Sequence, residues 1–189
     1  MVTIRHEAFA DVDAREELLD RVWGPARFAK TAERLRERRS PAEGLSLVAV
    51  QDENLIGTVR LWHVCAGPSR PALLLGPLAV EQAQRGCGVG TALVRRALGA
   101  ARRRGHRAVI LVGDQPYYGR FGFSAEKTGA LWLPGPYERH RLLACELFPG
   151  ALDGACGLIS ANGRASALPN LEVLIAGLAP NDLAARRAA

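Results

Sequence analysis

One stretch decides the fold: residues 73–91 read Leu-Leu-Leu-Gly-Pro-Leu-Ala-Val-Glu-Gln-Ala-Gln-Arg-Gly-Cys-Gly-Val-Gly-Thr. The first half is an apolar run that predicts a strand. Gly76-Pro77 interrupts it, because proline cannot donate to a ladder and glycine tolerates a bulge. The second half places glycines at 86, 88 and 90 in a turn that opens a helix. Bare backbone N–H groups at the positive end of a helix predict a site for an anionic ligand.

Apolar periodicity predicts the elements on both sides of this stretch. Upstream we expect a short strand, two helices and a hairpin: Val2–Ile4, Asp13–Trp23 behind a cap at Asp11, Lys30–Arg39 ending before Pro41, and Leu45–Gln51 with Leu55–Val64. The broken strand spans Ala72–Val80. Downstream we expect a helix, a buried strand, a short helix and two further strands: Gly88–Arg104, Ala108–Val112, Gln115–Phe121, and segments near Phe123–Lys127 and Arg141–Leu147. Strand, helix and strand in this order imply a right-handed crossover and a locally parallel pair inside a mixed sheet.

Length and composition favour one ordinary globular domain. The chain has 189 residues, 48% hydrophobic and 23% charged. No apolar run approaches the roughly 20 residues of a membrane span, and the N-terminus does not resemble a signal peptide, so we expect a cytoplasmic protein. The four cysteines are scattered without a CxxC pair or a neighbouring histidine cluster: Cys65, Cys87, Cys145 and Cys156. This spacing argues against structural zinc and against a disulfide scaffold, and it predicts no metal site.

The formal net charge of +6 raises the question of nucleic-acid binding. The arginines are spread over two segments, 34–39 and 95–104, and glutamates dilute the first. No zinc-finger spacing or basic-region heptads accompany them. Solvated helix faces and some attraction for an anionic ligand are the preferred interpretation, and nucleic-acid binding is disfavoured.

Two common phosphate-binding loops do not fit the glycine turn. A dinucleotide fingerprint needs G-x-G-x-x-G and an acidic residue about 20 positions onward. Here the spacing is G-x-G-x-G, and residues 105–112 contain no acidic residue. A Walker loop needs Gly-Lys-Ser/Thr, and no lysine lies between Lys30 and Lys127.

Residues 85–90, Arg-Gly-Cys-Gly-Val-Gly, fit the pattern R/Q-x-x-G-x-G after an apolar strand. This resembles the acetyl-CoA loop of the GNAT superfamily of N-acetyltransferases. The broken strand at Gly76-Pro77, the Y-x-x-x-G-F motif of residues 118–123 and the order of elements support the resemblance. Cys87 departs from the usual pattern, since a bulkier or charged residue is common there, but the glycine spacing is intact.

Further segments are similar to the YhbS-like subgroup of that superfamily: residues 75–80, 105–109, 113–123 and 133–136. The resemblance covers roughly residues 2–160. It implies an α/β (mixed α+β) fold with a central mixed sheet of about 6–7 strands flanked by helices, and a splayed parallel strand pair that forms the acetyl-CoA cleft. Residues 1–150 are then the N-acetyltransferase domain. Residues 151–189 are a C-terminal extension, packed on the domain or partly flexible, in which Leu171–Ala176 alone shows clear periodicity.

The resemblance implies that acetyl-CoA is the cosubstrate and that its pyrophosphate lies on the glycine loop, with pantetheine along the broken strand. The implied cofactor-binding residues are Leu78, Ala79, Val80, Arg85, Gly86, Cys87, Gly88, Val89, Gly90, Thr91, Asp114 and Tyr118. Tyr118 is the candidate proton donor to the leaving thiolate, because the pKa of a phenol, about 10, is closer to that of a thiol than any carboxylic acid's. Tyr117 is expected to pack, and Asp114 to cap the short helix.

The general base is less clearly marked. Glu81 is the candidate, acting directly or through a water, although a surface glutamate in a turn accounts for it as well. His63 is expected in the core or at a rim, and a cationic His106 would complement a helix end. An acyl-cysteine route through Cys87 is conceivable. Direct transfer in a ternary complex fits the family better.

The acceptor is an unidentified primary amine. Its site would be built from residues 11–41, 66–71 and 131–141, with Trp23, Trp132 and Tyr137 as possible lining residues. The alternative function is a CoA- or acyl-CoA-binding sensor or partner subunit without turnover. No membrane partner is expected, and the protein is expected to be a monomer or a homodimer.

Overall fold

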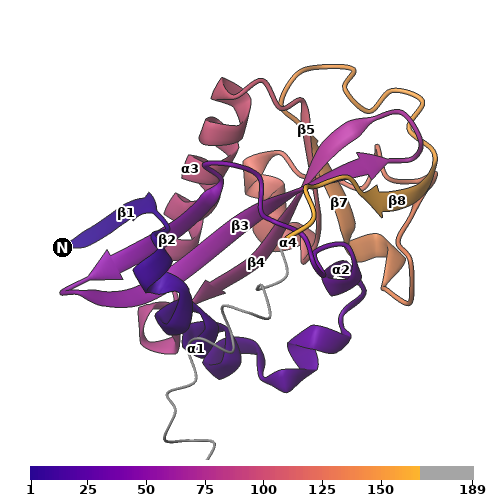
Figure 1. Ribbon diagram of the computed structural model, residues 1–189. Helices are drawn as coiled ribbons and strands as arrows, with labels where there is room; N and C mark the ends of the chain where they lie inside the picture. Colours follow the sequence, from indigo (N-terminus) through magenta and orange to yellow (C-terminus); the bar gives the residue numbers. More distant parts are fainter. Residues whose placement is uncertain (167–189) are drawn as a thin grey trace, which may run out of the picture.

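The structure is a computed structural model, and it describes residues 1–166. Figure 1 shows a twisted sheet with helices packed around it. The strands are β1 (Val2–His6), β2 (Ser46–Gln51), β3 (Asn54–Ala66), β4 (Pro71–Val80), β5 (Ala108–Val112), β6 (Leu131–Trp132), β7 (Leu142–Glu146) and β8 (Gly157–Ala161). The α-helices are α1 (Val12–Trp23), α2 (Thr31–Arg34), α3 (Val89–Arg103) and α4 (Gln115–Tyr118).

The sheet is mixed, and its main path runs β1-β2-β3-β4-β5-β7. Every pair on this path is antiparallel except β4–β5, which α3 connects as a crossover. Strand β8 pairs with the end of β3 and with β6, which brings the sheet to eight strands. The expected mixed α/β sheet is confirmed, with β6 and β8 as strands that the periodicity did not predict.

Strand β4 is broken where the sequence places Gly76-Pro77. Its register against β3 shifts there: Val59 pairs with Leu78, but Leu61 pairs with Leu75, so β4 contains one extra residue. Gly76 has φ +133°, a conformation that side chains rarely adopt, and its carbonyl accepts a hydrogen bond from the Trp62 indole. Along its other edge β4 pairs with β5 over two positions, at Leu73 and Leu74, and the strands then separate. The splayed parallel pair is confirmed.

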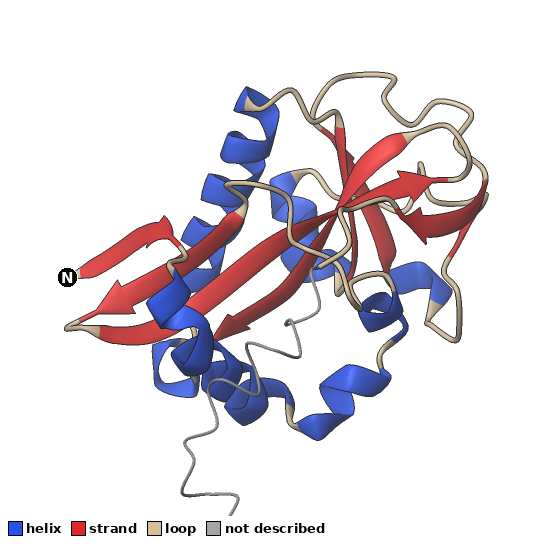
Figure 2. Cartoon of the chain, viewed as in Figure 1, coloured by secondary structure: helices blue, strands red, loops and turns tan. Residues whose placement is uncertain are grey.

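Strand alternation divides the core between the two faces of the sheet, with helices on both (Figure 2). On one face the strands pack with Leu93, Val94 and Ala97 of α3: Leu47, Val59, Leu61, Leu73, Leu75, Val109 and Leu111. On the other, Leu74 and Ile110 pack with Leu35 from the segment after α2. Leu18 and Leu19 of α1 cover Ala79 on β4. Helix α3 is amphipathic as predicted, because its buried positions recur at helical spacing.

Two predicted elements are wrong. The helix expected over Lys30–Arg39 is α2, which ends at Arg34 and continues as turns, with Arg38 at φ +53°. The strand expected near Phe123–Lys127 is one isolated bridge, from Ser124 to Ala144. In the first case backbone groups bond to a distant segment, and in the second Ser124 alone pairs with β7. Ser40 N–H, for example, donates to the carbonyl of Arg164.

The C-terminal extension begins as part of the packed molecule. Strand β8 lies in the sheet, and the buried residues before and in it join the core beside β3 and β6: Ala151, Leu152, Ala155 and Ile159. Backbone hydrogen bonds then link residues 164 and 166 to residues 40 and 38. The periodic segment Leu171–Ala176 lies outside the described residues.

Candidate functional site

The glycine loop lies between the end of β4 and the first turn of α3. Gly86 and Gly88 both have φ +83°, and a Cβ on either would meet no atom within 4 Å. Five backbone N–H groups in the loop and the first turn of the helix have no hydrogen-bond acceptor among the described residues. They belong to Gly86, Gly88, Val89, Gly90 and Thr91. Cys87 and Arg85 are exposed, and Thr91 is half-buried at the helix start. Free amides at the positive end of a 15-residue helix form a cradle for an anion.

The broken strand provides an open backbone edge next to this cradle. Leu78 and Val80 pair with Val59 and Gly57 of β3 on one side. On the other side, β4 pairs with β5 only at Leu73 and Leu74. Within the described residues, no strand pairs with this edge of β4 beyond Leu74. Ala79 is buried under α1, so the strand is held in place while this edge remains unpaired. An amide-bearing chain can add to such an edge as an extra strand.

A cavity of about 580 Å³ opens at the same break. Its floor comes from β4 at residues 75–78 and from the residues that follow β5, with Tyr118 and Asp114 among them. Its walls are Trp23 of α1, residues 27–36, and the 133–141 loop with Tyr137. Two hydrogen bonds hold these walls together: the Thr31 hydroxyl donates to the Pro136 carbonyl, and Arg34 Nη1 donates to the Pro134 carbonyl at 2.8 Å.

Tyr118 lies where the broken strand and the cavity meet. Its ring packs so closely on Gly113 that a Cβ there would lie 2.3 Å from Cε2 of the ring. Phe121 and Phe123 support the ring from other sides, with centroids 6.4 and 5.9 Å away. Burial raises the pKa of Tyr118 well above its usual value, and nearby Tyr117 and Asp114 raise it further. The hydroxyl therefore holds its proton at neutral pH.

Two other residues predicted from the sequence, Glu81 and Asp114, form ion pairs with arginines. Glu81 follows β4, and its carboxylate accepts from Arg21 of α1 at 3.1 Å. It does not line the cavity. The prediction that the Asp114 side chain caps α4 is wrong: it makes no cap hydrogen bond, and its Oδ1 lies 3.2 Å from Nε of Arg141. Asp114 is nevertheless at the N-cap position, and its backbone carbonyl accepts from Tyr117 and Tyr118.

The structure adds residues that sequence reasoning missed. Tyr117, expected to pack, directs its hydroxyl at the start of α3: a Cβ on Gly90 would lie 2.7 Å from it. Lys30 and Arg36 line the cavity, although their segment resembles a solvated helix. Of the three segments expected to build the acceptor site, 11–41 and 131–141 do line this cavity. The 66–71 loop does not, and Trp132 is half exposed under Arg139.

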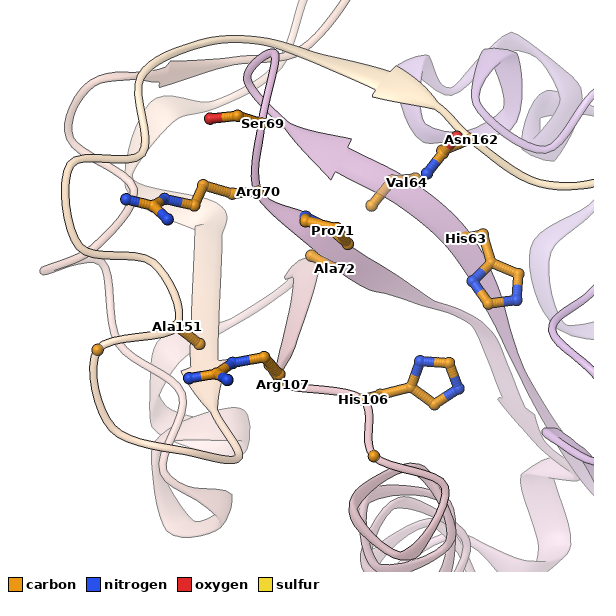
Figure 3. Close-up of a pocket in the computed structure, with 12 residues that line it drawn as sticks. His63, Val64, Ser69, Arg70, Pro71, Ala72, His106, Arg107, Ala151 and Asn162 are labelled. Atoms are coloured by element: carbon orange, nitrogen blue, oxygen red, sulfur yellow. The ribbon is translucent and has the colours of Figure 1, made fainter.

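The 66–71 loop borders a second cavity of about 470 Å³ at the opposite ends of β4 and β5. Figure 3 shows His63 and His106 facing one another across it, with Arg70 and Arg107 on its other side. The two imidazole centroids are 5.3 Å apart. Burial, and then His63 and Arg104, lower the pKa of His106, which disfavours a cation at this helix end.

Within residues 1–166, no group of three or more His, Cys, Asp or Glu side chains is placed to hold a metal ion. The four cysteines are free thiols in this structure. No helix of the described residues has the length and apolar character to cross a bilayer.

Comparisons with known proteins agree with this geometry. Residues 12–123 match the family described as Acetyltransferase (GNAT) family. Over 158 residues the chain is 32% identical to the uncharacterized N-acetyltransferase YhbS of Escherichia coli K12, covering 82% of this chain and 93% of that protein. A crystal structure of Escherichia coli YhbS in complex with CoA matches with a TM-score of 0.72 at 30% identity, covering 85% and 89% of the two chains. A GNAT family acetyltransferase from Brucella melitensis in complex with acetyl-CoA matches with a TM-score of 0.58 at 26% identity, covering 81% and 99%. The chain therefore belongs to the GNAT acetyltransferase family.

Proposed function

We propose that this protein transfers the acetyl group of acetyl-CoA to a primary amine by direct attack in a ternary complex. The observation that carries the proposal is the separation of β4 and β5 after two paired positions. The open edge leads from the free amides of the α3 cradle to the cavity that contains Tyr118. An elongated donor with a phosphate end and a reactive end matches this path, and the family and its CoA-bound relatives support it.

In this proposal the cradle binds the pyrophosphate and the open edge of β4 binds the pantetheine. The amides of residues 86–91 donate to the phosphate oxygens, while the backbone of Leu78–Val80 pairs with the pantetheine amides. Arg85 adds positive charge at the exposed rim, and Thr91 offers a hydroxyl. Tyr117, whose hydroxyl lies against Gly90, contacts the donor between its two ends.

Tyr118 is the proposed proton donor. The amine nitrogen attacks the thioester carbonyl carbon, the carbon–sulfur bond breaks, and the sulfur leaves as a thiolate that receives the Tyr118 proton. Because the pKa of Tyr118 is raised, donation is less favourable than from an ordinary phenol. The hydroxyl therefore first stabilises the developing thiolate as a hydrogen-bond donor and gives up its proton late. A backbone N–H at the break would stabilise the carbonyl oxygen.

The attacking amine must lose a proton, and Glu81 is the proposed base. Its carboxylate is 32% exposed and held by Arg21, so it would act through a water at the end of β4. If it does so, Glu81→Gln lowers kcat most at low pH, where less of the amine is already neutral. An unchanged pH profile would remove Glu81 from the mechanism.

Thiol detection of CoA release, with acetyl-CoA and a panel of primary amines, tests the proposal. We expect amine-dependent release, and Tyr118→Phe should lower kcat about 100-fold with little change in acetyl-CoA affinity. Tyr117→Phe is the matched comparison, because it removes a hydroxyl that lies against the donor path and should raise the KM for acetyl-CoA instead. Acetyl-CoA binding without release for any amine would instead favour the sensor.

A further inference from the structure

The cationic side chains of the acceptor cavity differ in how they are paired. Arg27 lies against Glu16 and Asp20, and Arg141 lies against Asp114 and Glu138. Each of these two arginines has two carboxylates within ion-pair distance in the described structure, although Nε of Arg141 makes no hydrogen bond. Arg36 and Lys30 also line the cavity. Arg36 has a single carboxylate partner, Glu33, and Lys30 has none among the described residues.

Arg36 is buried at the foot of the cavity. Its side chain is 7% exposed, and its one carboxylate partner is Glu33, at 2.8 Å from Nη2. Its Nε, like that of Arg141, is completely buried and has no hydrogen-bond partner among the described residues. A buried donor without a partner costs about 1–3 kcal/mol, so this N–H calls for an acceptor that enters the cavity. The flat guanidinium presents its donors in a fork that matches a carboxylate.

Lys30 adds a positive charge at the cavity that has no carboxylate partner among the described residues. Its ammonium lies 3.5 Å from the centre of the Trp23 ring, and within residues 1–166 it makes no ion pair with a carboxylate. Burial, and then the nearby Arg141 and Arg36, lower its pKa. An anion bound between Lys30 and Arg36 would relieve both groups.

The position of Arg36 limits the size of the anionic acceptor. Its Nη1 is 3.6 Å from the point where a Cβ on Gly76 would lie, so the guanidinium sits beside the break in β4. The reacting amine must reach the thioester at the same break. Carboxylate and amine are therefore separated by few bonds. Apolar and aromatic side chains line the cavity as well, beside the paired charges, and suit an apolar side chain; Leu75, Leu133 and Tyr137 are among them.

We propose that the acceptor is an α-amino acid with an apolar side chain, whose carboxylate pairs with Arg36 and Lys30 while its amine faces the thioester at the break in β4. This rests on the proposed acetyl transfer, which it deepens by naming the acceptor class. The carboxylate takes no part in the bond changes. The amine nitrogen forms the new C–N bond, and the thiolate leaves with the Tyr118 proton.

Matched amines test the proposal in the full chain. CoA release is measured with L-leucine, L-leucinamide and O-phosphoethanolamine. We expect kcat/KM for leucine to exceed that for leucinamide about 10- to 100-fold, the range of a charge-assisted hydrogen bond. Equal or faster reaction of leucinamide overturns the proposal, and preference for O-phosphoethanolamine overturns the carboxylate. Release with leucinamide alone would leave the acetyltransferase proposal standing, whereas absence of release with every amine would count against acetyl transfer itself.

Substitutions of Lys30 and Arg36 test whether these two residues bind the carboxylate of the acceptor. Lys30→Gln alters an exposed side chain and should fold, and Arg36→Lys retains the charge but loses the fork. Both should lower kcat/KM for leucine about 10-fold or more and leave that for leucinamide within about 2-fold. Lys127→Gln is the control, because it removes the chain's other lysine, which pairs with Asp153 on a different surface.

A binding measurement separates the site from turnover. With CoA present, calorimetry compares N-acetyl-L-leucine with N-acetyl-L-leucinamide, the products of the two amines. We expect the carboxylate compound to bind more tightly to the unmodified protein, and Lys30→Gln and Arg36→Lys to remove the difference. Equal affinities in the unmodified protein, or a difference that both variants preserve, would overturn the assignment.

Discussion

The two ends of the β4–β5 pair hold cavities of similar volume, about 580 and 470 Å³, but opposite construction. At the carboxyl ends the strands separate, and within residues 1–166 the amides of the glycine loop lack acceptors and the buried Nε of Arg36 lacks a hydrogen-bond partner. At the other end the strands are paired, and the cavity is bordered by two imidazoles and two arginines from loops (Figure 3). Charged side chains around a cavity therefore do not suffice to identify a site. Opened backbone at the carboxyl ends of strands, where ligands of open α/β sheets bind, is the more specific sign.

The largest expected difference concerns stability. Leu73 lies in the paired half of β4 and is fully buried, whereas Leu78 lies in the separated half and is partly buried. Leu73→Ala should lower the free energy of unfolding by about 2–5 kcal/mol. Leu78→Ala should lower it by about 1 kcal/mol. Urea denaturation measures both, and equal losses would mean that the separated half is packed as firmly as the paired half.

Substituting the glycines at the two ends of α3 distinguishes the effect of backbone strain on stability from an effect on ligand binding. Gly88 and Gly105 have φ +83° and +80°, and a Cβ on either would meet no atom within 4 Å. Valine at either position should therefore cost a similar amount, about 1–2 kcal/mol. Only Gly88→Val should weaken acetyl-CoA binding, on the order of 100-fold, because it obstructs the free amides. Calorimetry that found equal affinity in both variants would exclude the α3 cradle as the phosphate site.

A second glycine pair tests how the position of the Tyr118 ring affects the reaction. A Cβ on Gly113 would lie 2.3 Å from the Tyr118 ring, whereas one on Gly129 would meet nothing. Gly113→Ala should displace the ring and lower kcat about 10-fold, a part of what a general acid contributes. Gly129→Ala should leave kcat unchanged. If both variants turned over at the same rate, the position of the Tyr118 hydroxyl would not matter for the reaction.

The smallest effect is a pH dependence that belongs to the second cavity. The pKa of His106 is lowered in the folded protein, so the unfolded chain takes up this proton first. The contribution of His106 to stability is full above its ordinary pKa of about 6.5 and is lost as the pH falls through that value. Thermal denaturation should show this loss between about pH 7 and 5, reduced in His106→Asn. A decrease of the same size in His106→Asn would assign the loss to other groups.

Local chemistry explains which parts of this molecule could be predicted. The break at Gly76 and the loop at residues 86–90 depend on what glycine and proline can do within a few residues, and both were found. Strand β8 was not, because its order comes from pairing with the end of β3, about 95 positions away in sequence. The segment after Arg34 looked helical, but its backbone bonds to residues 164 and 166.

The cavity at the break in β4 likewise contains one residue that the sequence predicted and one that it did not. Tyr118 was predicted from a motif, whereas Arg36 stands in a run of arginines and glutamates that is typical of a solvated helix. Its burial arises only when the 133–141 loop, α2 and β4 meet. A charged residue's burial is set by tertiary contacts, so no periodicity within its own segment could have shown it.

The link between residues 38–40 and 164–166 has an evolutionary consequence. The bonds between Ser40 N–H and the Arg164 carbonyl, and between Ser166 N–H and the Arg38 carbonyl, use main-chain atoms only. Side chains in these segments can therefore change while the acceptor wall keeps its attachment. The segment proposed to bind the donor, by contrast, depends on Gly76, Gly86 and Gly88, whose positive φ other residues rarely adopt. We therefore expect side-chain substitutions in residues 38–40 and 164–166 to be tolerated better than substitutions of these glycines.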